Sequence, residues 1–186
     1  MQTVANEMGF TIEQDKDAVQ AAHHFQVSAM LQDVQLLDCT ASVSEAKSEI
    51  EGQLRLGLTM ETGVLSHSAE NARFWVRISI FGDPADAPEQ PEHHRFEVAC
   101  RYALAYGLRP GYDPSPQELD AFREGNAVFH CWPYSRELVQ NMTMRMGLPI
   151  PPLPFLRLAP KIAPKKSALK RSAKPQLHRG DEKADD

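Results

Sequence analysis

One stretch, residues 126–156, constrains the fold more than any other part of the chain. Apolar and small residues recur in its first part at steps of three and four, so they share one face of a helix. Pro133 lies inside this run and lacks a backbone donor, so we expect a kink or a restart of the helix there. Gly147 is expected to end the helix, because glycine takes the left-handed C-terminal conformation without steric cost. Four prolines in residues 149–154 then predict an extended path. The helical face comprises Val128, Cys131, Trp132, Ser135, Leu138, Val139, Met142 and Met146.

Length and charge limit the class of protein. A chain of 186 residues, 42% of them apolar, suits one domain with tails. Residues 159–186 hold 8 Lys/Arg against 4 Asp/Glu, whereas the body holds 12 against 21, which makes nucleic-acid binding by the body improbable. We expect no membrane span and no secretory signal. The three widely spaced cysteines imply no disulfide framework and favour a reducing cytoplasm.

Alternating apolar residues predict strands in the middle of the chain. Residues 54–61 alternate cleanly, with leucines and Met60 on one face. Residues 72–81 and 95–106 alternate in the same way, and short links without helices join these segments. We therefore predict an α+β fold, in which a four-stranded antiparallel sheet has helices packed on one face.

The first strand has two interpretations. From Phe25 to Leu31 apolar residues alternate, and from Val34 to Leu36 they alternate on the other parity, which predicts a bulge between the two parts. A helix through residues 18–31 is the competing interpretation.

The remaining segments complete the domain plan. Residues 1–24 are expected to form an N-terminal extension that frays or contains a short helix around residues 13–22. Ser115, Pro116 and Glu118 open a short helix with a capping box, which Gly125 is expected to close. The domain proper is predicted at residues 25–158. Residues 159–186 are predicted to form a disordered basic tail. The tail is either a solvated end or a contact for a ribosome, nucleic acid or membrane.

Catalytic and metal chemistry have little support in the sequence. His23-His24 and His93-His94 are adjacent pairs, whose side chains point to opposite faces of a strand. A metal site from the three cysteines and a histidine requires a chance convergence, and buried structural cysteines are the simpler interpretation. Phosphate loops, nucleophile elbows and zinc-helix motifs do not occur. We expect neither an enzyme nor a cofactor or metal.

The sequence carries a family resemblance. Trp-Pro-Tyr-Ser-Arg-Glu at 132–137, the amphipathic run after it and the Pro-Leu-rich exit resemble the Phe-Pro-Tyr-Ala-Arg-Glu helix and the exit of the SecB export chaperones. The string from Phe25 to Leu36 resembles the first SecB strand. The order of elements matches that family over about residues 25–156.

The resemblance implies an ATP-independent holdase that binds unfolded preproteins and delivers them to the SecA motor of the Sec translocase. It also implies a cytoplasmic homotetramer. Apolar residues on the sheet and exit would bind clients, namely Trp75, Phe81, Met144, Leu153 and Phe155. Acidic residues would dock the motor, namely Asp33, Asp38 and Glu97, of which Asp38 is one residue out of register. Core or oligomer contacts would come from Trp132, Tyr134, Leu138 and Met142.

Two features depart from the family pattern and leave alternatives open. Arg95 stands where the family has an apolar residue, and the family's second helix is not recognisable beyond Leu156. A SecB-like chaperone dedicated to an antitoxin of a toxin–antitoxin system is therefore one alternative. A noncatalytic protein-interaction module is the other. The apolar surplus on the sheet and exit by itself predicts only that the chain is not a monomer.

Overall fold

A computed structural model describes residues 2–4, 10–44, 54–84, 94–148 and 152–161 of the chain. The strands among them are β1 (Gln2–Val4), β2 (Phe10–Gln14), β3 (Ala29–Val43), β4 (Leu54–His67), β5 (Asn71–Pro84), β6 (Phe96–Leu108) and β7 (Leu156–Pro160). The helices are α1 (Lys16–Ser28), α2 (Pro116–Phe122) and α3 (Val128–Arg145), with a π-helical turn at Arg123–Ala127 between the last two.

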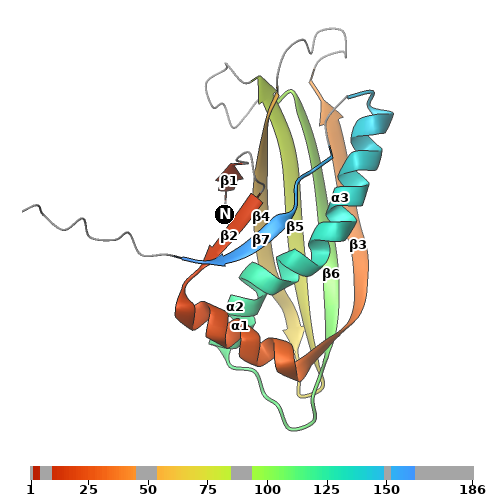
Figure 1. Cartoon of the computed structure of the whole chain (residues 1–186). Coiled ribbons are helices and arrows are strands. Elements are labelled where there is room, and N and C mark those ends of the chain that lie inside the picture. The colour runs from red at the N-terminus through yellow and green to blue at the C-terminus, as the bar shows by residue number, and fades with distance from the viewer. Residues whose placement is uncertain (1, 5–9, 45–53, 85–93, 149–151, 162–186) are drawn as a thin grey trace, which may run out of the picture.

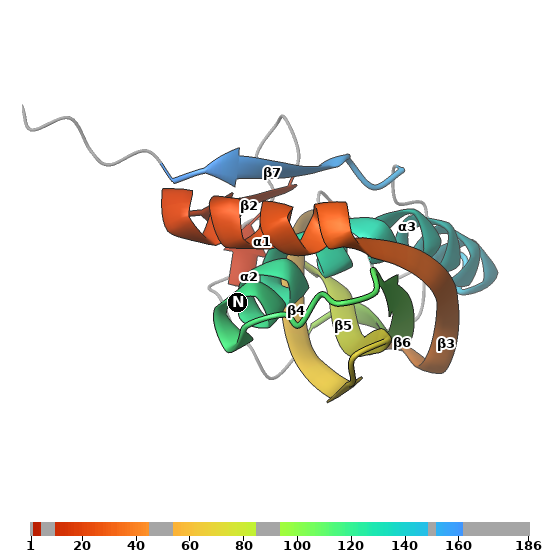
Figure 2. The same cartoon turned by 90° about the horizontal axis from the view of Figure 1, so that it is seen from below.

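The main sheet is antiparallel, with strand order β1-β4-β5-β6-β3. Its four long strands are the four that the alternation predicts, and the three-residue β1 adds to the outer side of β4. All three helices lie on one face of this sheet (Figures 1 and 2). The predicted α+β fold with helices on one face is therefore confirmed.

Alternation along the strands separates a covered face from an open face. On β5, Phe74, Val76, Ile78 and Ile80 are fully buried beneath the helices. Phe25 from α1 and Phe122 from α2 pack against Phe74 with ring centroids 5.6 and 5.7 Å away. Tyr106 of β6 closes this aromatic cluster, with its centroid 5.1 Å from that of Phe122. Burial of so much aromatic surface gives the covered face most of the core.

The first predicted strand is partly wrong. Phe25 and Val27 belong to α1, so the competing helical interpretation holds up to Ser28, and β3 begins at Ala29. Asp15 caps this helix by accepting from the backbone of Ala18 at 2.7 Å. The alternation misleads because only Phe25 of the pair is buried, whereas Val27 is exposed. The predicted bulge is confirmed between Leu31 and Asp33, and a second one follows between Leu36 and Asp38.

The predicted capping box at Ser115 and Glu118 is confirmed, but the predicted end at Gly125 is wrong. Instead of ending, the chain passes through the π-helical turn into α3. Gly125 packs closely against β2, because a Cβ atom there would lie 2.6 Å from Nε2 of Gln14 and would displace that side chain. The π-helical turn separates α2 from α3, whereas α3 continues through Pro133 without a restart, although Pro133 has no N–H to donate within the helix.

The end of α3 follows the prediction. Gly147 has φ of 74°, and its N–H donates to the Met144 carbonyl at 3.0 Å. The N–H of Leu148 donates to the Thr143 carbonyl at 2.9 Å. These two bonds form a Schellman motif, which reverses the chain toward the proline-rich exit.

The exit is extended where the structure describes it, and it pairs with an unexpected partner. β7 runs parallel to β2, with Phe10 opposite Leu156. Both strands lie on the helix side of the main sheet (Figures 1 and 2). Residues 1–24, predicted as an extension, thus contain β1, β2 and most of α1, and Phe10 is fully buried. β7 continues through Ala159 to Pro160, two residues past the predicted start of the tail, and residues 162–186 lie outside the described part.

Candidate functional site

The two aromatic residues predicted to bind clients on the sheet both lie on the open face. The Trp75 indole is half-buried over Gly63, where a Cβ atom would lie 2.2 Å from its Nε1. Phe81 covers Gly57 in the same way and stacks on His94, with centroids 3.9 Å apart, so it is only 8% exposed. Trp75 therefore remains accessible to a ligand, whereas Phe81 is largely covered by its own neighbours.

The other predicted client-binding residues lie on the opposite side of the molecule, around the exit. Met144 is 67% exposed and Phe155 is 71% exposed, but Leu153 is 2% exposed. The Phe155 ring lies over the Arg136 guanidinium, 4.8 Å from its carbon to the ring centroid. Met144 lies eight residues after Arg136 on α3, about 12 Å further along the helix axis. We call Arg136, Met144 and Phe155 the exit patch; Leu153 packs beneath the exit and is not available at its surface.

Trp132 holds the exit in place. Its indole Nε1 donates to the Pro154 carbonyl at 3.2 Å, and its ring meets Phe10 edge-on at 5.6 Å. At 3% exposure the Trp132 side chain is buried. Leu138 and Met142 are half-buried against the same core, while Tyr134 is 46% exposed. Of these four residues, Tyr134 alone has a largely exposed side chain.

A second apolar surface, which the sequence did not predict, lies between α3 and β3. On one rung, Leu31 is opposite Tyr106, whose hydroxyl lies 2.8 Å from Nδ1 of His130. Burial lowers the pKa of His130, so its neutral ring can accept the phenol hydrogen.

Two rungs further along the same face, beyond Val34 and Leu104, Leu36 is opposite Tyr102, whose ring lies 6.4 Å from that of Tyr134. Leu31, Leu36 and Tyr134 are all exposed, and we call these three residues the edge strip. The strip joins β3 to α3, which are far apart in sequence, so no local pattern could have revealed it.

The three predicted motor-docking carboxylates share the open face but not one patch. Asp33 is opposite Ala105 and Glu97 is opposite Ser42, so eight residues of β6 separate their rungs, roughly 26 Å at 3.3 Å per residue. Between them, Asp38 is opposite Arg101 and pairs with its guanidinium at 2.6 Å. The charge of Asp38 is therefore compensated within the chain, and the acidic character of this face is interrupted.

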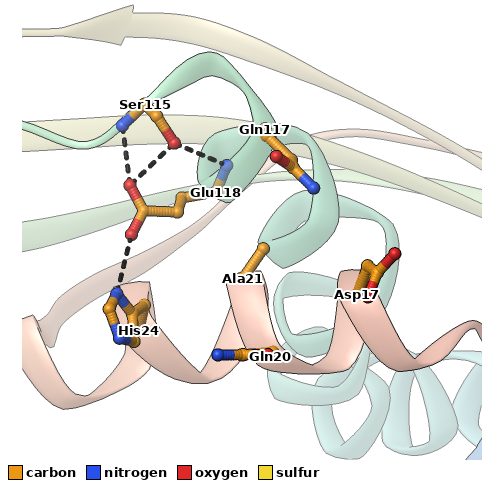
Figure 3. A pocket seen from close by; sticks show the side chains of 7 residues that line it. All are labelled: Asp17, Gln20, Ala21, His24, Ser115, Gln117 and Glu118. Carbon is orange, nitrogen blue, oxygen red and sulfur yellow. Dashed lines mark hydrogen bonds and ion pairs between the residues drawn. The ribbon is translucent and has the colours of Figure 1, made fainter.

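A polar cleft lies between α1 and α2, and the side chains that line it include the contact between these two helices (Figure 3). The backbone N–H and the hydroxyl of Ser115 each donate to Glu118 at 2.8 Å, and His24 Nδ1 lies 3.3 Å from the same carboxylate. Burial raises the pKa of Glu118, but the hydrogen bonds from Ser115 and His24 outweigh it, and the net pKa is lowered. The cleft lining is thus committed to holding the two helices together.

The cysteines converge more than the sequence suggested. Cys39 stands opposite Cys100, and burial together with Cys100 raises the pKa of Cys131. Within the described ranges, however, no group of three His, Cys, Asp or Glu residues is arranged to hold a metal ion.

The chain is similar to known proteins over most of its length, although no family model matches it. It is 29% identical over 150 residues to the SecB-like chaperone Rv1957 of Mycobacterium tuberculosis H37Rv, covering 73% of this chain and 81% of that protein. The same values apply to the SecB-like chaperone MT2006 of Mycobacterium tuberculosis CDC 1551.

Solved structures agree with the sequence comparison. The fold matches that of Rv1957 in complex with a ChAD peptide from the Rv1956 HigA1 antitoxin, with a TM-score of 0.62 and 23% identity over 75% of this chain and 97% of that chain. None of the helices described here is long and apolar enough to cross a membrane. The resemblance to the SecB-like chaperones, predicted from the motif at residues 132–137, is therefore confirmed in both sequence and fold.

Proposed function

We propose that the chain is a noncatalytic, ATP-independent holdase, which binds unfolded polypeptide segments in the cytoplasm. The observation that carries the proposal is the exit patch, where Met144 and Phe155 stand at 67% and 71% exposure. Large side chains exposed to this degree, on a frame fixed by Trp132 and α3, suit weak apolar contacts with many nonnative chains. Several such contacts on one oligomer would add up to a useful affinity.

The client class we propose is an antitoxin of a toxin–antitoxin system. Rv1957, with which this chain shares 29% identity, has been solved with a peptide from an antitoxin. The open face also favours this client class over export, because Arg101 neutralises Asp38 between the two remaining motor-docking carboxylates. Delivery to SecA remains the second function, to be tested through Asp33 and Glu97.

We further propose a homo-oligomer, most simply a tetramer. Its support is the edge strip, whose exposed Leu31, Leu36 and Tyr134 lie on or beside the outermost strand of the sheet, because exposed apolar surface of this kind can mark a subunit contact. A mass from light scattering that corresponds to a monomer at micromolar concentration would remove this architecture from consideration.

The holdase proposal is tested by aggregation of an unfolded antitoxin, followed by light scattering without ATP. We expect the parent chain to suppress aggregation, and the double variant Met144→Glu with Phe155→Glu to lose most of this activity. Val19→Glu is the matched control, because Val19 is also an exposed apolar residue but lies on α1. Full activity of the double variant would move client binding away from the exit patch. Equal protection of an unrelated preprotein would argue for export rather than a dedicated antitoxin.

A further inference from the structure

Two cysteines that are 61 positions apart in sequence meet across neighbouring strands. Cys39 of β3 and Cys100 of β6 are direct partners in the antiparallel ladder. Directly opposite residues of such a pair have side chains on the same face and Cα atoms about 4.5–5.5 Å apart. A disulfide spans Cα separations of about 4.4–6.8 Å, so the backbone already has the required spacing.

We propose that Cys39 and Cys100 form a thiol modification site, which closes to an intramolecular cross-strand disulfide when the chain meets a disulfide oxidant such as oxidised glutathione. Both are free thiols in the structure. The proposal rests on the sheet geometry and is independent of the holdase function.

The surroundings of the two thiols set the order of reaction. Cys39 is half-buried on β3, whose outer side has no neighbouring strand among the described residues. Cys100 is fully buried, with its sulfur 3.6 Å from both the Ile78 carbonyl and the Ser135 hydroxyl. The outer thiol therefore meets the oxidant first, and the inner thiol resolves the intermediate.

The chemistry balances in two exchange steps. The Cys39 thiolate attacks one sulfur of oxidised glutathione, which forms a mixed disulfide and releases one glutathione thiolate. Cys100 then attacks the Cys39 sulfur, and its proton passes to the leaving sulfur, which releases the second glutathione as a thiol. Two protein thiols are oxidised, and one glutathione disulfide is reduced to two thiols.

The third cysteine is excluded by its position. Cys131 lies on α3 and is fully buried, and burial strongly raises its pKa. It has no ladder partner that would fix its side chain opposite a thiol. Cys131 should therefore remain a thiol, and it provides an internal control.

The disulfide would link β3, the outermost strand, covalently to β6. β3 carries Leu31 and Leu36 of the edge strip, and as the outermost strand it is held through β6 alone among the described strands. A covalent link at Cys39 restricts the opening of β3 and closes the long chain segment between the two strands. We expect hydrogen exchange across residues 29–43 to slow upon oxidation.

The test is oxidation of the full-length protein with glutathione disulfide, followed by thiol titration after denaturation and by peptide mass mapping. We expect the thiol count to fall from three to one, with a mass loss of two hydrogen atoms and a peptide that joins Cys39 to Cys100. Burial, with a smaller contribution from Asp38, raises the pKa of Cys39, so the rate should increase as the pH rises toward the ordinary thiol pKa of 9.0.

Variants separate the proposed pair from its alternatives. Cys39→Ser, at the half-buried position, should abolish the intramolecular disulfide without emptying the core. Cys131→Ser should keep the disulfide and lose only the remaining thiol. A link between Cys100 and Cys131, a link between two chains, or a stable glutathione adduct on Cys39 would each overturn the proposal.

Discussion

The two faces of the main sheet come from the same strands but follow different rules. On the covered face, Phe74 and Tyr106 pack with Phe25 and Phe122 into one aromatic cluster beneath the helices. On the open face, one rung carries Glu61, Arg77, Arg101 and Asp38 across four strands. Parity thus decides which face a strand residue joins. The open face is mixed, because Arg77 and Arg101 are exposed whereas Ser79 and Phe81 are buried.

The difference shows which face specifies the fold and which is free for function. An apolar residue of the covered face has partners from β-strands and helices, so its replacement leaves a cavity. A charge on the open face is solvated and contributes about 0–1 kcal/mol through any single ion pair. The predictions below test this contrast, beginning with the largest expected effect.

Phe74→Ala and Phe81→Ala compare the two faces on one strand. Phe74 belongs to the aromatic cluster, and its truncation should cost about 3–5 kcal/mol, a large part of the roughly 5–15 kcal/mol that stabilises a typical domain. Phe81 contacts mainly Gly57 and His94 on the open face, so we expect a smaller loss. Urea unfolding measures both. Equal losses in the two variants would refute the division into a structural face and a free face.

Trp132→Ala and Tyr134→Ala make the same comparison on α3. Trp132 loses a buried ring, its edge contact with Phe10 and the hydrogen bond to Pro154, so we expect a cost of roughly 3 kcal/mol and a looser exit.

Tyr134 is the control, since it is half-exposed on the same helix and its truncation should cost less than half as much. Thermal unfolding and oligomer mass are the measurements. If Trp132→Ala left both unchanged while reducing client binding, the indole would belong to the client surface instead of the core.

The sequence predicted the structure best at regular apolar alternation and at the residues that begin or end helices. The alternating apolar residues of 72–81 are buried as predicted, because most of the residues paired with them on β4 and β6 are apolar as well and face the same side of the sheet. The Ser115 capping box and the Gly147 terminus are local backbone devices, so a few adjacent residues suffice to predict them.

The failures have a common physical cause, which is dependence on distant partners. Phe25 alternates like a strand residue but is held in α1 by Phe74 and Phe122. Gly125 lies within a π-helical turn and packs against Gln14, 111 residues earlier in the chain. The β2–β7 pair and the edge strip likewise join residues that are far apart in sequence. The ion pair of Asp38 depends on Arg101 of the neighbouring strand, 63 residues later in the chain.

The folding stability should depend on pH through Glu118, which caps α2 beside α1. Its lowered pKa means that the native state favours the carboxylate, so the stabilisation is present above the ordinary Glu value of 4.5 and is lost as the pH falls through the lower folded value. Glu118→Gln should therefore cost about 0.5–2 kcal/mol at neutral pH, the usual range for a helix cap.

This cost should shrink in acid, where the parent carboxylate is protonated as well. Urea unfolding of the parent and the variant at neutral and acidic pH tests the expectation. Asp120→Asn is the control, because Asp120 is an exposed carboxylate whose partner, Arg123, lies outside the cap. A pH-independent difference for Glu118→Gln would show that shape rather than charge holds α1 and α2 together.

The smallest effect is expected from Asp33→Lys combined with Glu97→Lys on the open face. The two rungs lie roughly 26 Å apart at 3.3 Å per residue, and Arg101 compensates the carboxylate between them, so the pair does not form one concentrated acidic field. Stability should change by no more than about 0.5 kcal/mol, and suppression of antitoxin aggregation should be unchanged. Glu61→Lys, on the same face but on β4, is the matched control.

Binding to a SecA motor, measured at low and high salt, decides between the two functions. A dedicated antitoxin chaperone needs no motor contact, so the double variant and the control should behave alike. A salt-dependent loss confined to the double variant would instead place motor docking on the open face and restore delivery for export, because charged partners on a solvated surface act mainly by steering encounter.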